Sequence, residues 1–251
     1  MARAQARANT SLRNIEIIRD FVENPLASVL ISMGNTKVLC TCSVQKDVPR
    51  WMKGTGRGWL SAEYSMLPGA SQERINREAV GGKQSGRTQE IQRLIGRSLR
   101  AVTDLDALGE TQIIVDCDVL QADGGTRTAA ITGSYVALYD LCTRLVMGGK
   151  LTSHPLKTAL AAVSIGIVDG EILLDLDYSE DSKAEVDLNV VMTGEEAFVE
   201  LQGTAEGKTF AKKELDEMLD IATSGIQQLI GIQAESLLIP PKPKELGFLR
   251  E

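Results

Sequence analysis

Apolar and polar residues follow one another in blocks that predict many short strands and three long helices. Runs rich in Val, Ile, Leu and Thr and bounded by turn residues are typical of strands, and they occupy residues 15–19, 27–33, 37–44, 58–67, 111–120, 160–168, 171–176, 187–192 and 197–201. Apolar residues at helical spacing predict helices over residues 89–105, 128–147 and 212–230. Two turn signals, Gly34-Asn35 and Asp169-Gly170, predict hairpins between neighbouring strands.

The order of these elements is several strands, a helix, a strand, a helix, several strands and a helix. This order is typical of the α+β class, and the chain looks internally duplicated because each half places strands before a helix. No low-complexity linker divides the chain, so we expect one domain over residues 1–234. Three prolines follow, and residues 235–251 are expected to form a flexible tail on the surface.

The composition is that of an ordinary globular protein, with 251 residues of which 43% are hydrophobic and 24% charged. No apolar run approaches the roughly 18 residues of a membrane span, and residues 1–20 lack the apolar core of a secretion signal. The four cysteines lie in apolar runs without metal-site spacing, which favours reduced, buried thiols and a cytoplasmic location. A single histidine, His154, excludes a multi-histidine metal site.

The net charge of −7 conceals an asymmetry between the two parts of the chain. Residues 1–100 hold 16 Lys and Arg against 8 Asp and Glu, whereas residues 101–251 hold 11 against 26. The asymmetry fits either uneven surface composition or a basic surface for a polyanion joined to an acidic part that holds a cation.

Two glycine-rich loops each precede a predicted helix, over residues 81–88 and 121–128. In the second loop, Gly124 and Gly125 are followed by Thr126 and Arg127, which supply exposed N–H groups, a hydroxyl and a planar cation. Together with a helix N-terminus, these groups suit a phosphate. Each loop also fits an ordinary turn, and neither matches the P-loop or the dinucleotide motif.

Six carboxylates lie within residues 175–187, and their oxygens suit Mg²⁺ or Mn²⁺ or a proton-transfer role. A solvated acidic hairpin is the alternative. Dispersed cations in the first part of the chain, with Trp51, Trp59 and Tyr64 nearby, suit phosphodiesters and unpaired bases. Trp59 and Tyr64 lie on a predicted strand, so we expect at least one of them in the core.

Taken together, these runs resemble the ribonuclease PH family of phosphate-dependent 3′-to-5′ exoribonucleases. The resemblance extends from about Leu12 to Ile230. Its motifs are residues 35–40, 58–64, 86–95, 116–128, 180–182, 187–193 and 202–207.

The resemblance implies a role for each matching residue. Arg87, Gly125, Thr126 and Arg127 match phosphate-binding positions; Asp181 and Asp187 match an acidic pair associated with Mg²⁺ and catalysis; and Arg57, Arg74 and Arg77 lie in an RNA-facing region. It further implies a ribosomal-protein-S5-domain-2-like fold and a homohexamer built as a trimer of dimers. The expected substrates are the 3′ ends of tRNA precursors and other RNAs, with inorganic phosphate as co-substrate and nucleoside diphosphates as products.

The chain departs from the family pattern at Ala6, Thr10 and Gly69, of which Gly69 bears on the RNA contacts. Two alternatives remain: a catalytically silent RNA-binding subunit of an exosome-like ring, and a small-molecule phosphotransferase. Retention of both Arg87 and Arg127 with both Asp181 and Asp187 disfavours the silent subunit. The basic first part of the chain is unexplained by the phosphotransferase.

Overall fold

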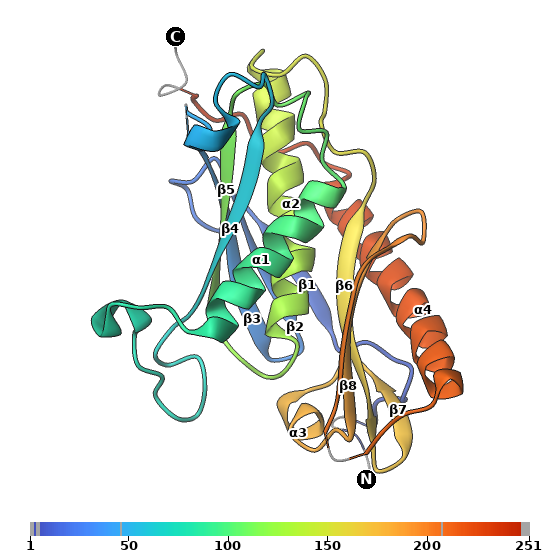
Figure 1. Ribbon diagram of the computed structural model, residues 1–251. Helices are drawn as coiled ribbons and strands as arrows, with labels where there is room; N and C mark the ends of the chain where they lie inside the picture. The colour runs from blue at the N-terminus through green and yellow to red at the C-terminus, as the bar shows by residue number, and fades with distance from the viewer. Residues whose placement is uncertain (1–2, 4–5, 46, 207, 247–251) are drawn as a thin grey trace.

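The computed structural model describes residues 3, 6–45, 47–206 and 208–246, and its strands form two sheets (Figure 1). The first sheet has the order β1-β2-β3-β5-β4. Its strands are β1 (Ile15–Arg19), β2 (Ala27–Met33), β3 (Thr36–Gln45), β4 (Trp59–Met66) and β5 (Gln112–Gln121). Neighbours are antiparallel except for β4 and β5, which run parallel. Because a parallel pair ends at one edge, the loops that follow β4 and β5 meet there.

The second sheet is antiparallel throughout and has the order β7-β6-β8-β9. Its strands are β6 (Leu160–Val168), β7 (Glu171–Leu174), β8 (Val186–Thr193) and β9 (Phe198–Ala205). The helices are α1 (Gly86–Ala101), α2 (Thr126–Met147), the short α3 (Tyr178–Asp181) and α4 (Lys212–Leu237). Single 3₁₀ turns occur at Arg50–Met52 and Glu78–Gly81.

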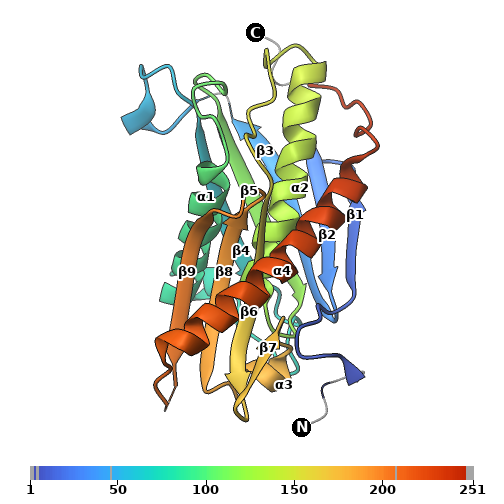
Figure 2. The ribbon, with the colours of Figure 1, turned by 90° about the vertical axis from the view of Figure 1, so that its right-hand side faces the viewer.

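Helices α1 and α2 lie between the two sheets, and α4 crosses the outer side of the second sheet (Figures 1 and 2). Small residues let α2 approach the first sheet closely, since a Cβ on Gly133 would come within 2.7 Å of Ile31. Every residue of β6 is buried because α2 and α4 both pack against it. One hydrophobic core therefore joins both sheets. None of the helices formed by the described residues is long and apolar enough to cross a membrane.

The predicted strands are all present, whereas the helix boundaries differ from the prediction. Helix α1 begins at Gly86 rather than at 89, because the Ser85 side chain accepts a hydrogen bond from the backbone N–H of Thr88 at 3.1 Å and caps the helix. Helix α2 begins at Thr126 rather than at 128. Arg87 and Thr88 of the first loop, and Thr126 and Arg127 of the second, thus lie inside a first helical turn.

The C-terminal segment also differs from the expected boundary at residue 235. Helix α4 continues to Leu237, and beyond it the Lys242 carbonyl accepts a hydrogen bond from Arg144 at 2.8 Å. Lys244 donates to the carbonyl of Pro25 at 2.8 Å. These bonds attach the segment up to residue 246 to the first sheet and α2, while the remainder of the expected flexible tail, residues 247–251, lies outside the described residues.

Candidate active site

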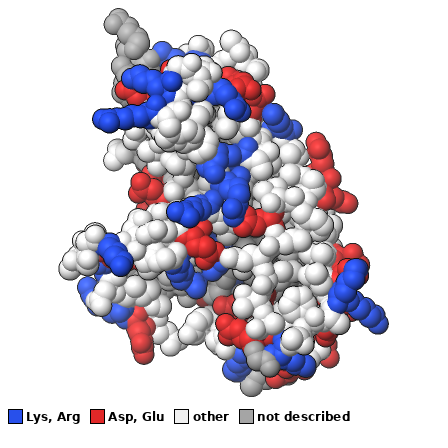
Figure 3. Space-filling model, viewed as in Figure 1, with Lys and Arg blue, Asp and Glu red and all other residues white. Residues whose placement is uncertain are grey.

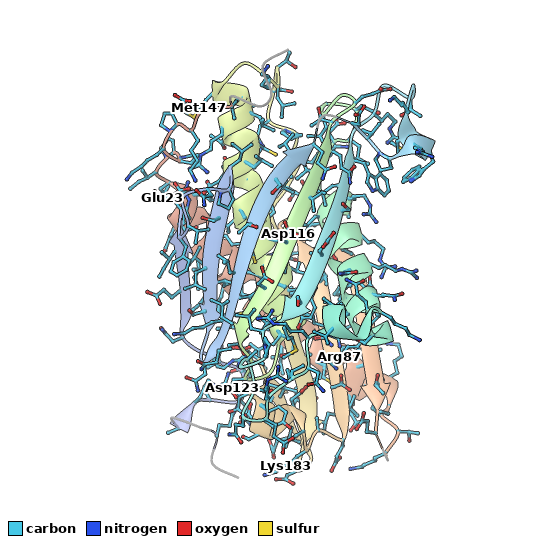
Figure 4. The ribbon with its side chains drawn as sticks, turned by 90° about the vertical axis from the view of Figure 1, so that its left-hand side faces the viewer. Glu23, Arg87, Asp116, Asp123, Met147 and Lys183 are labelled. Carbon is cyan, nitrogen blue, oxygen red and sulfur yellow. The ribbon has the colours of Figure 1, made fainter. Side chains whose placement is uncertain are left out.

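A cavity of about 730 Å³ opens at the edge where β4 and β5 end, between the two sheets. The first turns of α1 and α2, the turn of α3 and the start of β8 surround it. Its lining contains most of the predicted site residues: Arg74, Arg87, Gly125, Thr126, Arg127, Asp181 and Asp187. Figure 4 shows Arg87 and Asp123 at this end of the first sheet, and Met147 and Glu23 at the opposite end.

The loop after β5 has a conformation that requires glycine. Gly124 and Gly125 have φ values of 74° and 63°, and a Cβ on Gly124 would lie 2.5 Å from the Leu176 carbonyl oxygen. Arg13 donates to the Asp123 carbonyl, and the Thr36 hydroxyl donates to the Gly124 carbonyl at 2.6 Å. The carbonyls of this loop are therefore hydrogen-bonded by residues that do not line the cavity.

Helix α2 begins in this loop without a side-chain cap. The N–H groups of a first helical turn have no partner within the helix, and the helix dipole places partial positive charge there. The cavity therefore presents bare N–H donors beside the Thr126 hydroxyl, an arrangement suited to an anion.

Tyr64 lies beneath Thr126, and its Oη is 2.9 Å from the Thr126 Oγ1. Burial raises the pKa of Tyr64, partly offset by the Thr126 hydrogen bond and by Arg87 and Arg127. The phenol therefore stays protonated and can donate to Thr126, which frees the threonine proton for a bound anion. Tyr64 is thus a core residue, as expected for one of the two strand aromatics, and it also supports the site.

Arg87 and Arg127 reach the same cavity from the first turns of α1 and α2. The two guanidiniums act on the same groups, because each opposes the rise in the pKa of Asp181 and of Asp187. The structure therefore brings together the two loops that the sequence places about 40 residues apart.

Burial raises the pKa of Asp181, and the charge of Asp187 raises it further. Burial and the charge of Glu206 raise the pKa of Asp187 in the same way. The two carboxylates are thus close enough to repel each other electrostatically beside two arginines. Such a pair of carboxylates can keep a proton on one of its members or can bind a cation.

The other carboxylates of the acidic segment have partners elsewhere, so only part of the segment faces the cavity. Arg3 pairs with Glu180 at 2.7 Å, and Arg13 pairs with Asp175 at 2.7 Å. Asp177 caps α3 through the backbone N–H of Glu180. These contacts fix the turn that presents Asp181.

Among the described residues, no three His, Cys, Asp or Glu side chains are grouped so as to hold a metal ion by themselves. Asp181 and Asp187 fit the smaller share that a protein contributes when Mg²⁺ is held by one or two carboxylates, water and substrate phosphates. Their mutual repulsion and oxygen-only chemistry are compatible with that arrangement.

The three predicted RNA-binding arginines are not placed together. Arg74 lines the cavity, and Arg77 lines a neighbouring cavity that also contains Asp116. Arg57 precedes β4, pairs with Asp106 at 2.6 Å, and lies about 26 Å from the active-site edge, since the eight residues of β4 rise about 3.3 Å each. The structure does not bring Arg57 to the cavity.

Trp51 and Trp59 also lie at that distant end of β4. Trp51 is 64% exposed and meets Trp59 edge-on, with ring centroids 4.6 Å apart. Arg100 covers Trp59 at 4.5 Å. These two rings are therefore not positioned to stack on a base in the cavity.

Sequence reasoning gave no role to the Arg13 and Glu206 side chains, and it considered Tyr64 only as a base-stacking or core residue. The alternation of β4 places Tyr64 on the buried face, yet no local signal identifies Thr126 as its partner. Arg13 lies far along the chain from the loop it holds, so only the topology joins them.

Comparison with known protein families gives two matches along the chain. The model described as "3′ exoribonuclease family, domain 1" matches residues 11–143, and the model described as "3′ exoribonuclease family, domain 2" matches residues 158–225. The proteins named ribonuclease PH from Mycobacterium tuberculosis strain H37Rv and Mycobacterium sp. strain KMS are each 57% identical to this chain. The first alignment covers 98% of both chains, and the second covers 95% of this chain and 92% of the relative.

Solved structures show the same fold. A chain of the Archaeoglobus fulgidus exosome with RNA bound to the active site superposes with a TM-score of 0.78 at 22% identity, covering 92% of each chain. Rice Rrp46 superposes with a TM-score of 0.74 at 17% identity, covering 94% of this chain and all of that one.

Proposed function

The chain belongs to the ribonuclease PH family of 3′ exoribonucleases and is a phosphate-dependent 3′-to-5′ exoribonuclease, and we propose that inorganic phosphate binds in the cavity against Arg87, Thr126 and Arg127. The α+β class expected from the order of the elements and the fold implied by the resemblance are both confirmed. The observation that carries the proposal is that the first turns of α1 and α2, two arginines and two carboxylates of raised pKa meet in one cavity.

The proposed reaction is phosphorolysis of the last internucleotide linkage. An oxygen of the bound phosphate attacks the phosphorus of the 3′-terminal nucleotide, and the bond from that phosphorus to the 3′-oxygen of the preceding nucleotide breaks. The products are a nucleoside diphosphate and an RNA shortened by one nucleotide, whose 3′-oxygen takes up a proton. The reaction is reversible because the bond formed resembles the bond broken.

Positioning and charge neutralisation supply most of the expected rate enhancement. Arg87, Arg127 and the N–H groups of the α2 first turn hold the phosphate in line with the scissile bond. The same cations offset negative charge on the transferring phosphoryl group. Gly125 contributes through its backbone, since its positive φ allows the loop to follow the anion.

The acidic pair acts on the leaving side of the reaction. Asp181, with its raised pKa, would pass a proton to the departing 3′-oxygen. Asp187 would hold Mg²⁺, and the deprotonated form of Asp181 would be a further oxygen ligand; when bound, this ion would supply positive charge that offsets the charge of the phosphoryl group. Mn²⁺ suits the same oxygen donors.

For the RNA itself, we propose the 3′ ends of tRNA precursors and other RNAs, guided by Arg74 and Arg77 near the cavity. Arg57, at the other end of β4, would contact only RNA outside this cavity. A homohexamer built as a trimer of dimers in the cytoplasm completes the proposal. Retention of both arginines and both aspartates in one cavity supports an active enzyme over a silent RNA-binding subunit.

The proposed chemistry is tested by the products from one defined oligoribonucleotide with Mg²⁺, with and without inorganic phosphate. We expect nucleoside diphosphates when phosphate is present and negligible shortening when it is absent. Release of nucleoside monophosphates at a rate independent of phosphate would show hydrolysis and contradict the proposal.

The raised pKa of Asp181 also predicts a pH-dependent cost in stability. A carboxyl group whose pKa is higher in the folded than in the unfolded protein contributes stability at low pH, and this is lost as the pH rises through the folded pKa. Asp181→Asn is therefore expected to raise the urea unfolding midpoint at pH 7 to 8 in metal-free buffer. The difference should vanish below about pH 4, near the unfolded pKa.

Asp177→Asn is the matched control from the same segment. Although burial acts to raise its pKa, hydrogen bonds from Ser179 and from the backbone N–H of Glu180 bring the pKa of Asp177 below the usual value. This substitution should lower the midpoint at neutral pH. A lower midpoint for Asp181→Asn at neutral pH would contradict the account of the acidic pair.

A further inference from the structure

Arg127 is held by two side chains to which the preceding account gives no role. Its Nη1 donates to the Gln202 Oε1 at 2.6 Å and lies 3.2 Å from the Glu90 Oε1. The Gln202 Nε2 donates in turn to the same Glu90 oxygen at 2.6 Å. The three side chains therefore form a closed triangle, of which Arg127 lines the cavity.

The triangle engages one of the three guanidinium nitrogens of Arg127. Within the described part of the chain, Nη1 is the hydrogen-bonded nitrogen of Arg127, so Nε and Nη2 remain available for an anion. The Arg127 side chain is only 15% exposed. A guanidinium fixed at one end presents a fork of defined direction, which suits bidentate phosphate binding.

The triangle of Arg127, Glu90 and Gln202 also connects the helices on one side of the cavity to the second sheet on the other. Glu90 lies one turn after Arg87 on α1, and Gln202 lies on β9, two residues before Thr204, which is paired with Asp187. The triangle thus connects α1 and α2, which carry the two arginines, to β9, which pairs with the strand of Asp187.

A second side-chain contact also connects α1 to β9. Arg97 makes a two-pronged ion pair with Glu200, with Nε donating to Oε2 at 2.6 Å. Glu200 and Gln202 share a face of β9, and Glu90 and Arg97 lie two helical turns apart on α1. Figure 3 shows basic side chains gathered over α1 with acidic ones beside them. This second link ties the same two elements together without touching Arg127.

We propose that Gln202 and Glu90 are positioning residues that orient the Arg127 guanidinium toward bound phosphate. The inference rests on the proposed function, since it takes Arg127 as a phosphate ligand. Gln202 is the central member, because its amide oxygen accepts from Arg127 while its amide nitrogen satisfies Glu90. Without it, Glu90 is free to draw the guanidinium away from the phosphate.

The test is steady-state kinetics with phosphate and the oligoribonucleotide varied separately. We expect Gln202→Ala to raise the KM for phosphate about tenfold, while kcat and the KM for RNA change less than about threefold. The single change Q202E places two carboxylates together and should raise the same KM. The exchange E90Q/Q202E restores one donor amide and one acceptor carboxylate, so it should recover most of the loss.

Glu200→Gln is the matched control, since it weakens the second link between the same elements. If Glu200→Gln raises the KM for phosphate as much as Gln202→Ala does, the triangle serves only to connect α1 to β9. That result overturns the inference. Unchanged kinetics in Gln202→Ala, or no recovery in the exchanged pair, overturns it too. If Arg127→Ala is also without effect, the proposed phosphate site itself fails.

Discussion

Asp187→Asn is expected to reduce kcat for phosphate-dependent shortening by about three orders of magnitude. The substitution removes a negative charge from the cavity while keeping the size of the side chain, so folding should persist. The carboxylate is proposed to hold the cation beside the reacting phosphorus, and the loss of an acid–base or metal-binding group of this kind costs about 10²–10⁴ in rate. Its pKa, raised by burial and by Glu206, shows that a charge at this position is costly to maintain.

The measurement is single-turnover shortening of a 3′-labelled oligoribonucleotide, with RNA binding measured in parallel. Binding should persist, since the arginines remain. Asp169→Asn is the control, because Asp169 is exposed in the β6–β7 turn with a φ of 51°, a conformation that asparagine also tolerates. Full activity in Asp187→Asn would remove this carboxylate from the mechanism.

Arg127→Ala is expected to raise the KM for inorganic phosphate about 100-fold. Losing two charge-assisted hydrogen bonds costs about 3 kcal/mol, and each 1.4 kcal/mol corresponds to a factor of ten. In the reverse reaction, the KM for a nucleoside diphosphate should rise in parallel, because its β-phosphate occupies the same position. Initial rates over a wide range of phosphate concentration measure both effects.

Two further variants separate the shape of the arginine from its charge. Arg127→Lys keeps the charge but loses the planar fork, so its KM for phosphate should lie between those of the wild type and Arg127→Ala. Lys157→Ala removes an exposed cation that lies 3.8 Å from Asp104, and should leave the KM unchanged. Equal rises in the KM values for phosphate and RNA in Arg127→Ala would indicate a general loss of positive charge instead.

The chemistry of the two loops could be predicted from the sequence because its signals are local. Gly124, Gly125, Thr126 and Arg127 are consecutive, and their residue types alone indicate a turn with donors at a helix start. What the sequence could not show is that the first turn of α1 meets this loop. That meeting follows from the parallel pairing of β4 with β5, which places both loops at one edge of the sheet.

The N-terminal arginines illustrate the limit of charge counting. The first part of the chain is basic by sequence, which suggested a surface for a polyanion. Three of its arginines instead form buried ion pairs with the acidic segment. Arg3 and Arg7 pair with Glu180, and Arg13 pairs with Asp175. These partners lie more than 160 residues away along the chain, so no local pattern could have identified them.

Long-range contacts also explain the residues that sequence reasoning left without a role. Gln202 is an ordinary polar position on a strand, and Glu90 an ordinary acidic position on a helix. Their relation to Arg127 exists only because β9 lies beside α1 in the folded chain.

The most direct test of the account is a crystal structure of the protein soaked with inorganic phosphate. We predict one phosphate within hydrogen-bonding distance of Arg87, Thr126 and Arg127, close to Asp181 and Asp187. A fully occupied phosphate elsewhere, with this cavity empty at a phosphate concentration that saturates the reaction, would contradict it.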